Sequence, residues 1–129
     1  GPPADPRPPE VVAEEEFSRL ESSGLWAQGR HKEFYAALTE ITRRYLERRL
    51  PVPATRLTTT ELHRRLRQAE LDRALVGVFK ELFDQADLVK FSKITARQAW
   101  GAEDLAAARR LVRETTPKDM AVSAAPAKP

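Results

Sequence analysis

The chain has 129 residues, enough for one small domain but hardly for two. Its 22 lysines and arginines against 19 aspartates and glutamates leave a net charge of only +3, which suits a mixed-sign surface and does not favour nucleic acid as a partner. The sequence has no cysteine, which excludes disulfides, thiolate chemistry and cysteine-ligated metals, and no apolar run long enough to span a membrane.

Prolines divide the chain. Eight of the ten lie in the first nine and the last thirteen residues, where they favour extended, solvated backbone. We therefore expect a single helical domain over residues 10–116, between disordered tails at 1–9 and 117–129. Gly1-Pro2 has the form of a remnant of a cleaved purification tag and is set aside.

Apolar spacing predicts two helices in the first half of the domain. Residues 10–23 place apolar side chains at i, i+4 and i+7, and Gly24 is expected to end that helix. Residues 31–50 carry the clearest pattern and must stop before Pro51 and Pro53. The buried stripe of this second helix is predicted to consist of Phe34, Leu38, Ile41 and Tyr45.

The next two helices have recognisable start signals. Thr58 followed by Glu61 is a capping box, which predicts a helix beginning at Thr59. Asp72 can cap a fourth helix that runs to about Ala86.

Two short segments are predicted to be extended. Residues 54–58 precede the capping box, and in residues 88–94 apolar and polar side chains alternate as in a strand. A fifth helix follows Gly101. The prediction is a mainly α, five-helix compact domain, winged-helix-like with at most two very short strands; a plain helical bundle is the alternative.

A winged helix raises the hypothesis of DNA binding, in which the second helix of the motif enters the major groove. That helix would be residues 72–86, and its charges sum to −1. Phosphate repels an acidic helix, so nucleic acid is an unlikely partner. A winged-helix nucleic-acid-binding domain stays as the alternative function, and a spacer without a partner as the third.

Arginines are concentrated in residues 43–73, which contain nine of them and no lysine. Guanidinium groups pair bidentately with carboxylates and phosphates, which favours protein or lipid-headgroup partners. The other interpretation is a solvated face whose charges pair within the domain, including with the acidic residues 10–16. The candidate partner-binding residues are Arg43, Arg44, Arg48, Arg64, Arg65 and Arg67.

Signals of catalysis are absent from the sequence. His31 and His63 have no neighbours at metal-ligand spacing, and no nucleophile motif or phosphate-binding glycine loop occurs. We therefore expect no enzymatic activity, no cofactor, and no catalytic or metal site.

Several segments, taken in order, resemble a known pattern: FYAALTEI at 34–41 leading into RYLE at 44–47, TTTEL at 58–62 and DLVKFS at 87–92. Over about residues 12–116 the chain is similar to the cytosolic segment that follows the transmembrane helix in BatD-like bacterial membrane proteins and a related family of uncharacterised membrane proteins. Their genes typically lie beside those of MoxR-type AAA+ ATPases and von Willebrand factor A proteins.

This resemblance implies a protein–protein interaction module at the cytoplasmic side of the bacterial inner membrane, with the transmembrane helix outside this chain and an AAA+ ATPase or von Willebrand factor A protein as partner. The family supplies no catalytic residues to carry over. The residues that carry the resemblance are explained equally well by a structural role, through packing, helix capping or an Asp87–Lys90 pair, as by a functional one. They are Phe34, Tyr35, Tyr45, Thr59, Glu61, Asp87, Lys90 and Phe91.

Overall fold

The computed structural model describes residues 5–118 and is mainly helical. The prediction of five helices is confirmed, and the described residues contain no strand, so the comparison with a winged helix gains no support. The elements are α1 (Pro9–Glu21), α2 (His31–Arg49), the 3-10 turn η1 (Ala54–Arg56), α3 (Thr59–Gln68), α4 (Arg73–Phe91) and α5 (Trp100–Thr115).

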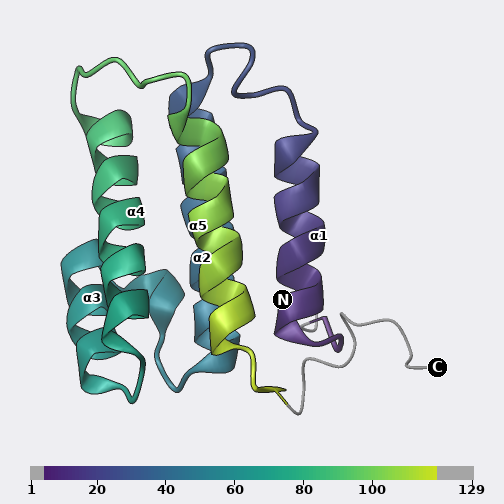
Figure 1. Ribbon diagram of the computed structural model, residues 1–129, viewed down its shortest axis with the longest axis vertical. Helices are drawn as coiled ribbons and strands as arrows, with labels where there is room; N and C mark the ends of the chain where they lie inside the picture. The colour runs from purple at the N-terminus through teal and green to yellow at the C-terminus, as the bar shows by residue number, and fades with distance from the viewer. Residues whose placement is uncertain (1–4, 119–129) are drawn as a thin grey trace.

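Helices α2 and α5 form the centre of the bundle, because each packs against the other and against both α1 and α4. Figure 1 shows these four helices side by side along the long axis, with α1 and α4 on opposite flanks of the α2–α5 pair. The short α3 packs on α4 at one end, and the connections 22–30 and 92–99 lie at the other end. Surfaces on α3 and at the C-terminus of α4 are therefore far apart.

The core consists of the apolar stripes that helical spacing predicts. Phe34, Leu38, Ile41 and Tyr45 of α2 are all buried. They pack with residues that α1, α4 and α5 direct inward, the largest of which are Phe17, Phe79 and Phe83. Burial of apolar area drives the association of these helices and supplies most of their stability.

Both predicted helix starts are confirmed. The Thr58 hydroxyl accepts from the Glu61 amide at 3.1 Å, and a Glu61 carboxylate oxygen accepts from the Thr58 amide at 2.9 Å. At the start of α4, an Asp72 carboxylate oxygen accepts from the amide of Ala74 at 2.8 Å. These bonds satisfy amide donors that a helix leaves without an internal partner.

Three element boundaries differ from the prediction. Helix α5 begins at Trp100, so Gly101 lies inside its first turn and does not precede the helix. Helix α4 continues to Phe91 instead of ending near Ala86, so the extended segment at 88–94 is wrong for its first four residues. Val89 faces the core at 4% exposure, whereas Phe91, two residues later, is 79% exposed, which fits a helix and not an alternating strand. Helix α1 ends at Glu21, and Gly24 adopts a φ of +80° in the connection that follows.

The segment before the capping box is likewise a 3-10 turn at Ala54–Arg56, with only its last residues extended. At the N-terminus, Arg7 contacts the bundle by donating to Glu15 at 2.6 Å and accepting from Arg48 at 2.9 Å. The expectation of disordered tails otherwise falls mostly on residues 1–4 and 119–129, which lie outside the described part of the chain.

Candidate functional site

The six candidate arginines separate into two groups. Arg43, Arg44 and Arg48 lie on α2, whereas Arg64, Arg65 and Arg67 lie on α3. The structure gives these groups different surroundings, which the sequence does not distinguish.

Arg43 forms its contacts within the chain. Its Nη1 donates to the carbonyl oxygens of Ala54 at 2.7 Å and Leu57 at 2.5 Å, and its guanidinium lies 5.3 Å from the centre of the Phe83 ring. Desolvation lowers the pKa of Arg43. These contacts hold the chain between α2 and α3 against α4, so this guanidinium has few donors left for a partner.

The other two α2 arginines also bind within the chain. Arg44 bridges Glu16 at 2.8 Å and Glu40 at 3.2 Å, and Arg48 donates to the Arg7 carbonyl. Arg49, the next arginine, pairs with Glu10 in a largely buried position. Pairing with the acidic first turns of α1, one of the two interpretations of the arginine cluster, is therefore confirmed for Arg44 and Arg49.

The three arginines of α3 form what we call the α3 arginine face. All three are exposed, and none makes an ion pair with another residue of the described chain. Arg65 has one long contact, 3.5 Å from Nη2 to the Pro51 carbonyl oxygen. The nearby carboxylates of Glu61 and Asp72 are occupied as helix caps. Glu61 and the exposed Glu70 keep their negative charges nearby, so what distinguishes these arginines is that their guanidinium donors stay available.

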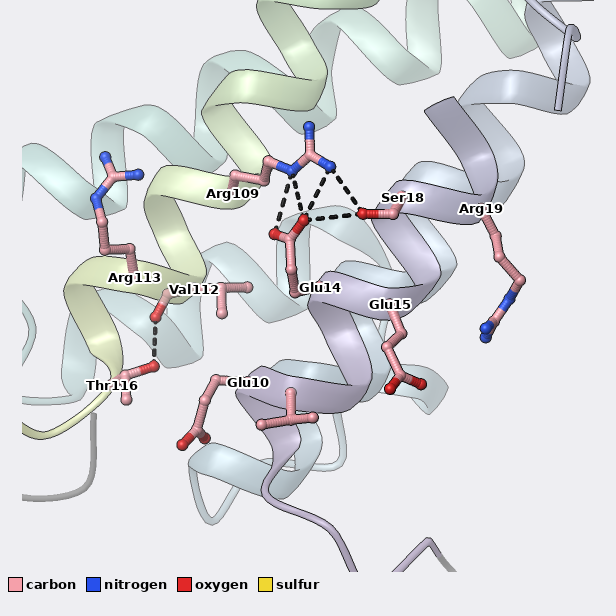
Figure 2. A pocket seen from close by; sticks show the side chains of 10 residues that line it. Glu10, Glu14, Glu15, Ser18, Arg19, Arg109, Val112, Arg113 and Thr116 are labelled. Atoms are coloured by element: carbon pink, nitrogen blue, oxygen red, sulfur yellow. Dashed lines mark hydrogen bonds and ion pairs between the residues drawn. The ribbon is translucent and has the colours of Figure 1, made fainter. Parts of the chain in front are cut away.

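A groove between α1 and α5, with a volume of about 610 Å³, was missed by the sequence analysis. Figure 2 shows Arg109 of α5 reaching across to Glu14 and Ser18 of α1. The Arg109 Nη2 lies 2.9 Å from Glu14 and 3.2 Å from Glu21. Val11 and Val112 add apolar surface to the lining. Because the arginine is already matched by carboxylates, it serves mainly to fasten α1 to α5.

Glu10 lies at the end of this groove near Thr116 (Figure 2) and is only 8% exposed. One of its carboxylate oxygens pairs with Arg49, and the other, Oε2, has no hydrogen-bond partner among the described residues. The pairing across α1 and α2 makes Glu10 part of the helix interface.

A second buried carboxylate lies between α2, α4 and α5. Asp104 accepts hydrogen bonds from the hydroxyl of Tyr35 and from the Gln85 amide, the latter at 2.6 Å. Burial raises the pKa of Asp104, and burial together with the neighbouring carboxylate raises the pKa of Tyr35. No cation pairs with this carboxylate among the described residues, so the cluster joins three helices through neutral donors.

The histidines pack against aromatic rings. His31 stacks on Trp26 with ring centres 4.1 Å apart, and His63 lies parallel to Phe79 at 6.4 Å. Within residues 5–118, no three histidine, aspartate or glutamate side chains are grouped to hold a metal ion. Among the described helices, none is both long and apolar enough to cross a membrane.

The pattern residues of the BatD-like resemblance mostly have structural roles. Tyr35 and Tyr45 are buried, and Asp87 lies 3.9 Å from Lys90. Phe91 differs from the expectation that it packs, because it is 79% exposed. The sequence matches no protein-family model, and neither curated proteins nor solved structures include a significant match to the chain.

Proposed function

We propose that the chain is a non-catalytic interaction module that docks an acidic protein surface through the α3 arginine face. The observation that carries this proposal is the contrast between the two groups of arginines. Those of α2 are bonded to carboxylates and carbonyls of the same chain, whereas those of α3 are exposed without a carboxylate partner in the described residues. An exposed guanidinium fork suits bidentate pairing with a partner's carboxylates.

The resemblance to BatD-like proteins supports a class of partner. A MoxR-type AAA+ ATPase or a von Willebrand factor A protein is the candidate, at the cytoplasmic side of the bacterial inner membrane. The module then binds a partner at one end of the helical bundle and does not itself catalyse a reaction.

Nucleic acid is the alternative occupant of an arginine-rich surface. In a winged helix α4 would enter the groove, but its three cations are matched by three carboxylates, and Phe79, Leu82 and Phe83 on it are committed to the core. Phosphate contacts need uncompensated cations on the inserted helix. An acidic protein is therefore the better fit.

The chain is immobilised, and the experiment measures how much of a purified MoxR-type ATPase and of a purified von Willebrand factor A protein it retains. Both proteins are taken from the organism that encodes the chain. The charge reversal Arg64→Glu with Arg67→Glu is expected to weaken retention by about tenfold or more, because attraction becomes repulsion. The matched control, Arg19→Glu with Arg113→Glu, changes two exposed arginines of α1 and α5 by the same charge and is expected to bind as the wild type does.

Equal retention of the α3 variant and the wild type would overturn the proposal. So would a loss that occurs only in the control variant, because it would move the contact to the α1–α5 groove. Binding of nonspecific duplex DNA with a steep salt dependence would favour the nucleic-acid alternative instead.

A further inference from the structure

An apolar patch lies at the end of the bundle opposite α3. Leu88, Phe91 and Ile94 are 49%, 79% and 42% exposed, and they are the large hydrophobic side chains left exposed within residues 5–118. Leu88 and Phe91 are neighbours on the last turn of α4, and Ile94 follows in the connection to α5. We call these three residues the α4 end patch. Apolar side chains gathered at one exposed place mark a contact with another surface.

Cations accompany the α4 end patch along the chain. Residues 88–99 contain Lys90, Lys93 and Arg97 and no carboxylate. Lys32, at the start of α2, lines the same hollow of about 380 Å³ as Ile94. The side chains of Lys32, Lys93 and Arg97 are exposed and form no ion pair with the rest of the described chain.

The carboxylates at this end are largely occupied. Asp87 lies near Lys90, and Glu33 pairs with Arg30 at 2.5 Å. Glu103, in the first turn of α5, is the remaining exposed carboxylate of this region. The rim of the patch therefore keeps an excess of positive charge.

The shape of this end limits what can cover it. Figure 1 shows the C-terminal end of α4 and the segment 92–99 at an extremity of the long axis. The connection 22–30 lies at the same extremity (Figure 1), so a flat surface that approaches this end of the bundle meets both connections. A second copy of the chain fits poorly, because two cationic rims would face each other and three side chains fall short of the roughly 800 Å² per partner of a stable interface.

We propose that this end of the bundle docks on an anionic phospholipid bilayer. The α4 end patch enters the boundary between headgroups and acyl chains, and Lys32, Lys93 and Arg97 lie among the lipid phosphates. Few groups are involved, so the contact is reversible and weakens as salt is added. This inference is independent of the proposed function, because α3 lies at the other end and stays accessible to a protein partner.

The experiment is flotation of the full chain with vesicles of equal parts phosphatidylcholine and phosphatidylglycerol, compared with vesicles of phosphatidylcholine alone, at low salt. The wild type is expected to float with the anionic vesicles only. Phe91→Ser with Ile94→Ser should lower the affinity at least about tenfold, since two apolar side chains no longer leave water. Lys93→Glu with Arg97→Glu should lower it as well.

The matched control is Arg64→Glu with Arg67→Glu, which makes the same charge change on α3 and should float as the wild type does. The proposal would be overturned if the wild type did not float with anionic vesicles. It would also be overturned if the variant Phe91→Ser with Ile94→Ser floated as well as the wild type. Loss of flotation in the α3 variant would place the lipid contact on α3 and also overturn it.

Folding is checked by circular dichroism and melting temperature, which the exposed positions of these substitutions should leave unchanged. If the apolar variant melts earlier, Lys93→Glu with Arg97→Glu decides the question, because it alters exposed charges alone. A concentration-dependent increase in mass that the apolar variant abolishes would assign the patch to a second copy and contradict lipid docking.

Discussion

The indole ring of Trp26 packs so closely on Gly101 that a Cβ atom added to this glycine would lie 2.5 Å from the ring atom Cδ2. Trp26 belongs to the connection between α1 and α2, whereas Gly101 lies in the first turn of α5. The indole Nε1 also donates to the Gln98 carbonyl at 3.0 Å. One side chain thus joins both connections at this end of the bundle, and only glycine leaves room for it.

Gly101→Ala is expected to lower the free energy of unfolding by about 1–3 kcal/mol, because the new methyl group displaces the indole ring. Gly77→Ala is the matched control: it also replaces a helical glycine, but nothing lies within 4 Å of the added atom. It should raise stability by about 0.5–1 kcal/mol. Urea denaturation measures both, and a Gly101→Ala protein as stable as the wild type would disprove the packing argument.

Arg43→Met is expected to reduce the free energy of unfolding by about 1–3 kcal/mol, since the carbonyls of Ala54 and Leu57 lose their donor in a half-buried place. Arg64→Met removes an exposed arginine without such bonds and should change stability by less than about 0.5 kcal/mol. Equilibrium unfolding in urea compares the two. Equal losses of stability in the two variants would show that the hydrogen bonds of Arg43 do not stabilise the fold.

The buried Asp104 predicts a specific pH dependence. Burial raises its pKa above the ordinary value of about 3.9, so the folded state holds this proton more tightly than the unfolded state. The stability that this bound proton contributes is fully present below the pKa of Asp104 in the unfolded chain. It is lost as the pH rises through the higher pKa of Asp104 in the folded state. Relative to Asp104→Asn, the wild type should therefore lose stability over that interval and then level off. A constant difference, or one that grows with pH, would contradict this assignment.

Thr58→Ala removes one half of the capping box at the start of α3 and is expected to cost about 1 kcal/mol. Thr60→Ala, two residues further on and exposed, removes a hydroxyl that makes no capping bond and should be nearly neutral. Thermal melting followed by circular dichroism distinguishes them. Similar melting temperatures for the two variants would mean that the cap does not limit stability.

Local signals explain which parts of the fold the sequence predicts well. The bonds that start α3 and α4 join residues two or three positions apart, so Thr58 and Asp72 reveal them directly. The end of α4 has no such signal. Four alternating residues fit a strand, in which Val89 and Phe91 would share one face. In the assembled bundle Val89 is 4% and Phe91 79% exposed, a difference that the sequence does not reveal.

The candidate site depends on contacts that sequence reasoning does not reach. Arg43 and Arg64 are alike as residues, but the carbonyls that engage Arg43 come from a turn 11 and 14 positions away. The Tyr35–Asp104 bond joins residues 69 positions apart and depends on how α2 meets α5. The sequence reveals how many charges there are, and the packing of helices decides which of them stay available.

The most direct test of the proposed docking surface is a nitrogen-15 NMR titration of the chain with the purified MoxR-type ATPase, followed at the backbone amides and the arginine Nε groups. If α3 is the docking surface, the first signals to shift or broaden belong to Arg64, Arg65, Arg67 and the rest of α3, while the signals of Arg43 and of the α1–α5 groove keep their positions. Shifts confined to that groove, with the α3 signals unchanged at saturation, would contradict it.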